Sequence, residues 1–390
     1  MFSSKQNKNL KTEVNMKKLK LMTILGTRPE IIRLSEVIKK ADKYFDHILV
    51  HTGQNYDYQL NQVFFDNFGL KEPDYYLDSP GKDLGETIGN IIAKSYEIIQ
   101  KEQPDALLVL GDTNSALSAI SAKRLKVPIF HMEAGNRCWD WNVSEMVNRK
   151  IVDHISDVNL PYTEHARRYL LSEGIDGKTT FVTGSPMTEV LEQNKESIEE
   201  SKVLEELGLE PGKYFLVSAH REENIDNEDK FMRLMTAINN IAEKYQYPVI
   251  FSTHPRTKNF IERRNFKFHE LVRNLEPFGY FDYNKLQKEA FCVLSDSGTL
   301  SEESALLGFP GVLIRTSTER PEVLDHGTII IGGVDTEVVE QSVELATSMY
   351  LNNEETVMPD DYIDKNVSIK VIKIIQSYTD IVNKTVWLKD

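Results

Sequence analysis

The chain has 390 residues, which is more than one ordinary domain holds and enough for two. Hydrophobic residues make up 40% of it and charged residues 27%, as is typical of a globular protein with a sizeable core. The net charge of -14 argues against a protein that coats nucleic acid or an anionic membrane, although a local basic cleft could still hold a phosphate.

The start of the chain is polar and has no apolar stretch before Leu19, so no secretory signal is visible. We expect residues 1–17 to form a disordered lead-in to the first strand. No run approaches the ~20 apolar residues that a membrane span needs. The two cysteines, Cys138 and Cys292, fit a reducing compartment and have no metal-site spacing. We therefore expect a cytoplasmic protein with no integral membrane segment and no metal site.

Short apolar runs alternate with longer amphipathic stretches in the first half of the chain. Because these runs are apolar on both faces, they indicate a parallel sheet with helices on both sides. The sequence predicts strands at 19–25, 47–51, 106–110 and 128–132, and helices from Pro29 onward and over 83–100.

The same pattern restarts near Tyr214. It predicts strands at 215–217, 249–253, 292–294, 312–314 and 329–331, and helices over 228–244 and 367–383. We therefore predict two doubly wound, Rossmann-like α/β domains over 18–190 and 200–365, with the boundary in the polar stretch 193–202. The last segment, 366–390, is predicted to be a helix that packs back on the first domain. Two facing sheets of this kind bind ligands in the cleft at the carboxyl ends of their strands.

Acidic side chains and a histidine follow several of the predicted strands. Such groups could supply proton donors and acceptors on two faces of a bound sugar, as inversion of a carbon requires. The alternative is that Glu133 or Glu145 forms a buried ion pair with Arg137 or Arg149. The candidates are Asp112, Glu133, Glu145 and His220.

A turn of small residues, 297–299, opens a predicted helix that contains Glu303. Its backbone N–H groups could approach a diphosphate, helped by the helix dipole. Arg28 and Arg320 could add charge-assisted contacts. No GxxxxGK[ST] is present and no GxGxxG follows the first strand, which argues against a P-loop and a nicotinamide site.

Each of these motifs also has a structural interpretation. Residues 112–113 could cap a helix, His254-Pro255 could be a strand exit, and the turn at 297–298 could be only a turn. Their shared position after strands favours a ligand site over these separate explanations, because that edge lines the cleft.

In these segments the chain resembles the non-hydrolysing UDP-N-acetylglucosamine 2-epimerase family, from Lys18 to about Ser377. Each matching piece is short, but their order and spacing together are highly specific. The pieces are GTRPE (26–30), TGQ (52–54), GDT (111–113), HMEAG (131–135), NR (148–149), HREEN (220–224), HP (254–255), DSG with EE (296–303) and TERPE (318–322).

The resemblance implies two Rossmann-like domains arranged as in GT-B glycosyltransferases. It implies catalysis without nicotinamide or metal, hence no cofactor, and a homodimer. The implied chemistry removes the C2 proton with loss of UDP, leaves an enzyme-bound 2-acetamidoglycal, and then adds UDP back with C2 inverted.

The resemblance also implies roles for individual residues. The departures are Thr299, where the family usually has a second glycine, Ser144-Glu145-Met146 in place of Pro-Glu-Glu, and Arg33 in place of lysine. The implied catalytic set is Arg28, Asp112, Glu133, Glu145 and His220. The implied UDP-binding set is Ser297, Gly298 and Thr299 at the diphosphate, Glu303 at the ribose, Tyr283 over the uracil, and Arg320 and His220 near the nucleotide.

A finer likeness concerns the substrate. Five segments, 53–58, 131–138, 148–154, 159–170 and 183–187, resemble UDP-N-acetyl-L-fucosamine synthases of capsule and O-antigen assembly. These enzymes epimerise C2 of UDP-2-acetamido-2,6-dideoxy-β-L-talose. The UDP-GlcNAc branch usually has histidine after TGQ, where this chain has Asn55.

The sequence leaves several functions open. We expect an epimerase acting on the L-talo sugar nucleotide, with a UDP-GlcNAc/UDP-ManNAc 2-epimerase as the alternative. A GT-B glycosyltransferase would share the fold and the UDP site but would need an acceptor cleft. A non-enzymatic UDP-sugar sensor would not need Asp112, Glu133 and His220 together.

Overall fold

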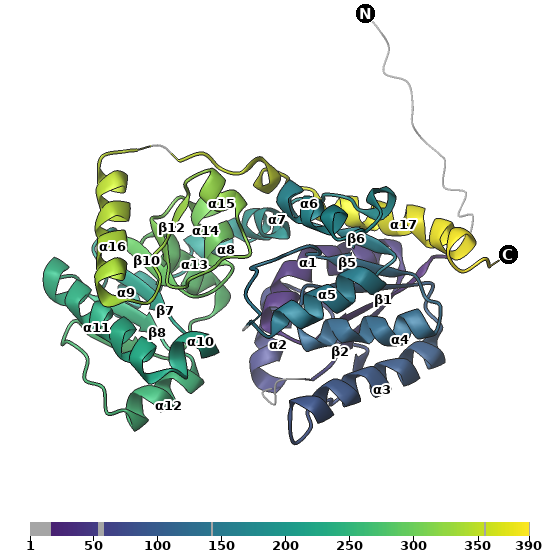
Figure 1. Cartoon of the computed structure of the whole chain (residues 1–390), viewed down its shortest axis with the longest axis horizontal. Coiled ribbons are helices and arrows are strands. Elements are labelled where there is room, and N and C mark those ends of the chain that lie inside the picture. Colours follow the sequence, from purple (N-terminus) through teal and green to yellow (C-terminus); the bar gives the residue numbers. More distant parts are fainter. Residues whose placement is uncertain (1–16, 54–57, 142, 355, 390) are drawn as a thin grey trace, which may run out of the picture.

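The computed structural model describes residues 17–53, 58–141, 143–354 and 356–389. The chain forms two lobes side by side, each built on a six-stranded sheet whose strands are all parallel (Figure 1). The predicted fold of two doubly wound α/β units is therefore confirmed. The predicted lead-in at 1–17 lies outside the described residues, except for its last position.

The first lobe alternates strands and helices from the start of the described chain. Its strands are β1 (Lys20–Leu25), β2 (Asp46–His51), β3 (Tyr75–Tyr76), β4 (Ala106–Leu110), β5 (Ile129–Met132) and β6 (Val158–Leu160). Its helices are α1 (Arg28–Tyr44), α2 (Tyr58–Asn67), α3 (Leu84–Glu102), α4 (Ser118–Arg124), α5 (Glu145–Ile155), α6 (Glu164–Ser172) and α7 (Pro186–Gln193), with 3-10 turns at Asn114–Leu117 and Gly177–Thr179.

The second lobe repeats this alternation. Its strands are β7 (Phe215–Ser218), β8 (Val249–Ser252), β9 (Val272–Leu275), β10 (Cys292–Ser295), β11 (Gly311–Leu313) and β12 (Ile329–Ile331). Its helices are α8 (Lys195–Glu199), α9 (Val203–Leu207), α10 (Glu222–Ile225), α11 (Glu228–Tyr245), α12 (Pro255–Arg263), α13 (Tyr280–Lys288), α14 (Leu300–Leu307), α15 (Glu322–Asp325) and α16 (Thr336–Leu351).

Both sheets have the same strand order. The first runs β3-β2-β1-β4-β5-β6, and the second runs β9-β8-β7-β10-β11-β12, which is the corresponding arrangement. In this topology the chain leaves the two central strands in opposite directions, and the crevice at their carboxyl ends is the usual ligand site. The repeated order therefore places one such crevice on each lobe, after β1 and β4 and after β7 and β10.

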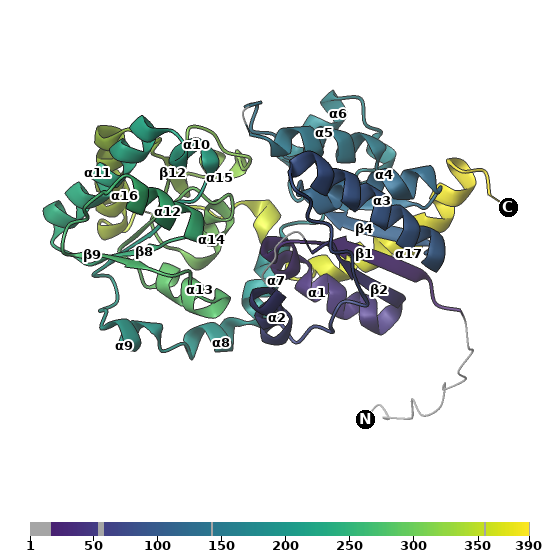
Figure 2. The ribbon, with the colours of Figure 1, turned by 90° about the horizontal axis from the view of Figure 1, so that it is seen from below.

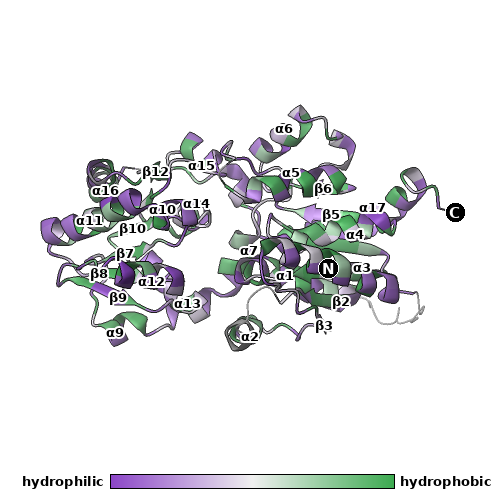
Figure 3. Ribbon diagram, turned by 60° about the horizontal axis from the view of Figure 1, so that its bottom comes forward, coloured by the Kyte–Doolittle hydropathy of each residue, from purple (hydrophilic) through white to green (hydrophobic). Residues whose placement is uncertain are grey.

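The central strands are apolar on both faces because helices cover both sides of each sheet. All residues of β4 are buried, and β7 and β10 are buried except for one half-buried serine in β7. Figure 3 shows apolar residues concentrated in the strands, with hydrophilic residues on the outer helices. The sequence missed β3, β6 and β9, which are edge strands and are short or carry polar residues.

The final helix, α17 (Val367–Thr385), returns to the first lobe and lies along α1 (Figure 1). Its apolar face joins the same core as β1 and α1, through Val367, Val371 and Ile375, which are fully buried. In the part of the chain that the structure describes, no helix is long and apolar enough to cross a membrane.

The chain passes between the lobes twice. The first passage runs through α7 and α8 (Figure 2), so the polar stretch where we predict the domain boundary is largely helical. The second passage follows α16 and includes the short 3-10 turn Asp360–Tyr362 before α17 begins. The two passages are joined by a hydrogen bond of 2.6 Å from the Thr188 hydroxyl to the Tyr362 carbonyl.

Candidate active site

The crevices of the two lobes face each other and enclose a cavity of about 270 Å³. It is lined by segments that follow β1, β4 and β5 in the first lobe and β7, β10 and β11 in the second. Most residues that the sequence placed at the site line this cavity. They are Asp112, Glu133, Glu145, His220, Ser297, Gly298, Thr299 and Arg320.

Glu133 is a carboxylate of the cavity that three side chains hold in place. It accepts hydrogen bonds from Arg33 at 2.8 Å, Arg320 at 2.6 Å and the Asn136 amide at 3.0 Å. Its backbone has a φ of 63°, a left-handed conformation that side chains other than glycine seldom adopt. Burial raises the pKa of Glu133, but the two guanidinium groups outweigh it, so the pKa lies below its usual value.

Asp112 lies directly after β4, and its side chain is 25% exposed toward the cavity. Arg149 holds it through Nε at 2.7 Å and Nη2 at 2.6 Å, both to Oδ2. Burial raises the pKa of Asp112, and the nearby charges of Glu133 and Glu145 raise it further. Arg149 opposes this shift without cancelling it. Asp112 and Glu133 therefore have pKa values that are shifted in opposite directions.

A third acidic group, Glu30, also lines the cavity and was not among the predicted catalytic residues. It accepts hydrogen bonds from the Gly26 N–H at 3.0 Å, the Thr27 hydroxyl at 2.8 Å and the Ser115 hydroxyl at 2.6 Å. Burial raises its pKa to about 6, although these hydrogen bonds lower it. Glu30 thereby ties the loop after β1 to the loop after β4.

His220 faces these carboxylates from the second lobe. Its Nδ1 lies 3.1 Å from Oδ1 of Asp296, a fully buried residue that also accepts the backbone N–H of His220 and Arg221. Burial lowers the pKa of His220, but Asp296 outweighs it and the pKa is raised. Since 42% of the side chain is exposed, the imidazole can meet a ligand.

The small-residue turn follows β10 and leads into α14, as the sequence predicted. The Ser297 hydroxyl accepts the Thr299 N–H at 3.3 Å, and the two hydroxyls lie 2.9 Å apart. A side chain at Gly298 would stand 3.8 Å from a Glu319 oxygen, so the space over the turn is open. The turn therefore presents backbone and hydroxyl groups to the cavity from the second lobe.

Three predicted site residues lie outside the cavity lining. Arg28 lies over the Phe64 ring, with 5.5 Å from Cζ to the ring centroid. Glu303 is buried behind the turn, where the Gln287 amide donates to it at 2.6 Å and burial raises its pKa. Tyr283 packs against the apolar core of the second lobe, and burial raises its pKa too.

The ion-pair alternative for the acidic residues is wrong in the form proposed from the sequence. Arg137 binds Asp153 and Glu173, not Glu133 or Glu145. Arg149 binds Asp112 instead. Glu145 accepts a hydrogen bond of 3.1 Å from the Ser144 hydroxyl and lines the cavity at the start of α5.

Three ion pairs join the lobes across the cavity. Arg33 donates to Glu302 at 2.7 Å, Arg320 to Glu133 at 2.6 Å, and Arg149 lies 3.3 Å from Glu319. In the sequence, Arg33 is notable only because the family usually has lysine at that position, and the sequence predicts no role for Glu302 or Glu319. The same arginines bind carboxylates of the cavity: Arg33 and Arg320 bind Glu133, and Arg149 binds Asp112. A movement of one lobe relative to the other would therefore also move these acids.

One of the five segments that resemble UDP-N-acetyl-L-fucosamine synthases is described only in part. The segment 53–58 contains residues 54–57, which lie outside the described residues. Among the described residues, no group of three or more His, Cys, Asp or Glu side chains is arranged to hold a metal ion.

Comparison with known proteins gives a consistent result over most of the chain. The family profile described as UDP-N-acetylglucosamine 2-epimerase matches residues 38–376. The chain is similar to the solved structure of UDP-N-acetylglucosamine 2-epimerase from Rickettsia bellii, with 48% identity and a TM-score of 0.89 over 95% of this chain and 100% of that one.

Two archaeal proteins are also similar. One is the UDP-N-acetylglucosamine 2-epimerase of Methanococcus maripaludis, 37% identical over 346 residues, which cover 86% of this chain and 94% of the relative. The other is the structure of Methanocaldococcus jannaschii UDP-GlcNAc 2-epimerase in complex with UDP-GlcNAc and UDP. It shows 33% identity and a TM-score of 0.85 over 92% of this chain and 100% of that chain.

Proposed function

Because the chain belongs to the UDP-N-acetylglucosamine 2-epimerase family, we propose that it converts UDP-2-acetamido-2,6-dideoxy-β-L-talose to UDP-N-acetyl-L-fucosamine. The coarser activity follows from the family itself: the protein is a non-hydrolysing isomerase that acts at C2 of a UDP-2-acetamido sugar. The finer proposal includes a role in capsule or O-antigen synthesis, a cytoplasmic location and a homodimer.

One observation carries the catalytic part of this proposal. The cavity brings Asp112 and Glu133 from the first lobe opposite His220 and the turn at 297–299 from the second. Acid–base groups and a set of hydrogen-bond donors therefore meet in one space. We assign the diphosphate to the turn and to His220, and the sugar ring to the side lined by the carboxylates.

The opposite pKa shifts support separate roles for the two acids. Groups whose environments push their pKa values apart are suited to act as an acid and a base. Glu133, whose pKa is lowered, stays ionised and is our candidate base. Asp112, whose pKa is raised, is our candidate acid on the other face of the ring.

The proposed reaction breaks two bonds and forms them again. The hydrogen at C2 is not acidic, because C2 bears an amide and no carbonyl, so simple deprotonation would leave an unstabilised carbanion. If the C1–O bond to UDP breaks as the base takes the C2 proton, the departing diphosphate takes the electrons. The resulting 2-acetamidoglycal then accepts UDP at C1 and a proton at C2 from the opposite face. Arg320 and the turn would stabilise the released diphosphate.

Turnover in D₂O is expected to place deuterium at C2 of the product, because the acid that returns a proton to the opposite face carries a deuteron from the solvent. Positional isotope exchange should also scramble oxygen label between the bridging and non-bridging positions of the β-phosphate, if the released UDP can rotate. Mass spectrometry and NMR of the product check both results. Complete retention of the C2 hydrogen would count against an exchanging base, and a requirement for added NAD would exclude elimination.

A substrate panel tests the choice of sugar. The L-talo nucleotide is expected to turn over at least tenfold faster than UDP-GlcNAc, because a pocket shaped for a C6 methyl group leaves the GlcNAc hydroxyl poorly hydrogen-bonded. The support for this choice lies in segments such as 131–138 and 148–154, which border the cavity. Initial rates for both sugars under identical conditions decide it. Faster turnover of UDP-GlcNAc would contradict the choice of sugar but would still be consistent with epimerase activity.

UDP-GlcNAc is the second candidate substrate, and the relatives favour it. Those described above are named UDP-N-acetylglucosamine 2-epimerases. The same panel separates the candidates. It also tests the glycosyltransferase and sensor alternatives, since an isomer formed without any acceptor fits neither of them.

A further inference from the structure

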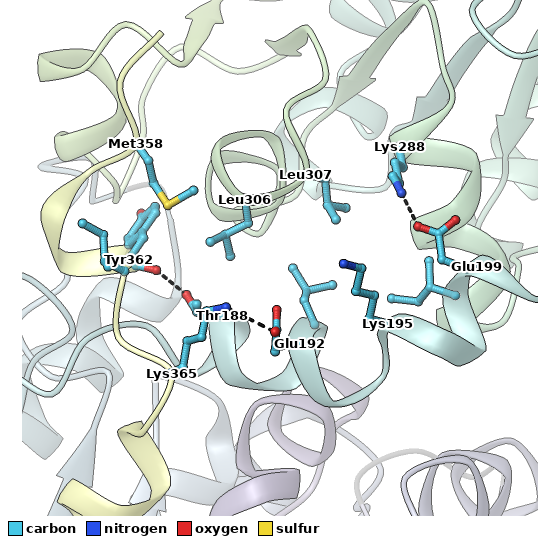
Figure 4. A pocket seen from close by; sticks show the side chains of 13 residues that line it. Thr188, Glu192, Lys195, Glu199, Lys288, Leu306, Leu307, Met358, Tyr362 and Lys365 are labelled. Atoms are coloured by element: carbon cyan, nitrogen blue, oxygen red, sulfur yellow. Dashed lines mark hydrogen bonds and ion pairs between the residues drawn. The ribbon is translucent and has the colours of Figure 1, made fainter.

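A second cavity, of about 430 Å³, lies where the chain passes between the lobes (Figure 4). One wall is the first passage, formed by α7 and α8. The opposite wall is the end of α14 together with the second passage near Met358 and Tyr362. None of its lining residues borders the candidate active site, so it is a separate space.

We call this second space the hinge cavity, and its lining is mostly apolar. Its volume falls in the range of about 300–1,000 Å³ that is typical of small-molecule sites, which are mainly apolar with a few polar groups. The Thr188–Tyr362 hydrogen bond joins the two passages beside it. The aliphatic side chains and the methionine of the lining are Leu191, Ile198, Leu306, Leu307, Met358 and Ile363.

Among the described charged residues that line the hinge cavity, one lysine has no ion-pair partner. Glu192 pairs with Lys365 at 3.2 Å, and Glu199 pairs with Lys288 and with Lys285. Among the described residues, Lys195 has neither an ion-pair partner nor a hydrogen-bond partner. Figure 4 shows its side chain beside the apolar ones of the cavity, between the two ion pairs. Both acids at the rim are thus neutralised, and the remaining charge is positive in a chain of net charge -14.

We propose that the hinge cavity binds an amphiphile with a single alkyl chain and an anionic head group. The alkyl chain lies among the leucines and Met358, and the head group pairs with Lys195. Burial of the alkyl chain stabilises the complex in proportion to the apolar surface that is removed from water. The exposed ion pair contributes less, but it selects an anion over a cation.

The position of the hinge cavity gives the ligand a way to act on the active site. Both passages between the lobes line it, and it is formed in an arrangement in which ion pairs also join the lobes across the active site. A ligand that fits this arrangement stabilises it relative to any more open one. Binding in the hinge cavity and binding of UDP should therefore favour each other, by the same factor in both directions.

Calorimetric titration with four probes tests the binding itself. Decanoate and decyl phosphate are expected to bind, whereas decyltrimethylammonium, with the opposite charge, and acetate, without the chain, are expected to bind at least tenfold more weakly. Tighter binding of decyl phosphate than of decanoate identifies a phosphate head group, and the reverse identifies a carboxylate. Equal binding of the anionic and cationic amphiphiles would overturn the proposal.

Variants locate the site. Leu307→Trp fills the hinge cavity and is expected to reduce decanoate binding more than tenfold. Lys195→Glu, which changes an exposed side chain, should weaken it about threefold to tenfold. Lys202→Gln, an exposed lysine close by that does not line the cavity, serves as the control and should change nothing. Unaltered binding in Lys195→Glu would refute the site even if Leu307→Trp fails to fold.

The coupling is measured as UDP affinity with and without saturating decanoate. We expect UDP to bind about fivefold more tightly with decanoate present, at the lower end of common allosteric effects. If UDP affinity is unchanged while decanoate binds normally, the coupling between the two sites is refuted but the binding site itself is not. Failure of UDP to bind at all would count against the proposed function instead, since the decanoate titration does not depend on it.

Discussion

Replacing Asp112 by asparagine is expected to lower turnover at least a hundredfold while leaving UDP affinity within about threefold of the original. An asparagine keeps the size of the side chain and can accept from Arg149, but it can neither give nor take a proton. Loss of a positioned acid–base group typically costs about 10²–10⁴-fold in rate. Turnover is measured with a saturating UDP-sugar, and UDP affinity is measured by calorimetry.

The first lobe offers a matched control for Asp112→Asn. Asp42 also lies in an ion pair and has a similar exposure, 29% against 25% for Asp112, but it lies outside the cavity. Asp42→Asn should leave turnover nearly unchanged. If Asp112→Asn also turned over at a near-normal rate, Asp112 would only hold Arg149 in place and the proposed acid would have to be another group.

Replacing Glu302 by glutamine is expected to destabilise the protein by about 3–5 kcal/mol, the usual cost of removing one partner from a buried ion pair. Glu302 is fully buried and accepts from Arg33 at 2.7 Å and from Arg320 at 3.2 Å, and it also receives the Ser185 hydroxyl. The change leaves two buried guanidinium groups sharing Glu133 alone. The decrease in the free energy of unfolding is measured by chemical denaturation.

The control for Glu302→Gln is Glu344→Gln, which removes one partner of the exposed Lys244–Glu344 pair. Exposed pairs are screened by water, so this variant should unfold at the same denaturant concentration as the original. A second comparison is Glu302→Leu combined with Arg33→Met, which should be less harmful than Glu302→Gln because fewer charges stay unpaired. A loss below about 1 kcal/mol for Glu302→Gln would mean that water already reaches these arginines.

Local sequence was sufficient to predict most of the fold. Central strands such as β4 and β10 are short, apolar on both faces and bounded by glycine or polar residues, so their pattern stands out. Edge strands give no such signal. β3 has two residues, and β9 carries Arg273 and Asn274, because a strand with one neighbour can leave polar side chains in water.

The candidate site was predictable where it depends on position after a strand. Asp112, Glu133, His220 and the turn at 297–299 all follow strands and all reach the cavity. Contacts between side chains were not predictable. Arg33 and Glu302 are 269 positions apart in the chain, so nothing in either local sequence shows that they meet. Tyr283 was placed by resemblance alone, and its contacts with the core of the second lobe depend on packing that the sequence does not display.

The return of α17 to the first lobe affects how the chain can fold as it is synthesised. Domains commonly fold in the order in which the ribosome releases them. Here the core around β1 and α1 includes Val371, Ile375 and Val382, which are made after all the strands of the second lobe. Among the described residues, those of the second lobe's core extend no further along the chain than Tyr362. The second lobe can therefore be completed while the first still exposes an apolar face, so a nascent or truncated chain that ends before Val367 is a natural client for chaperones.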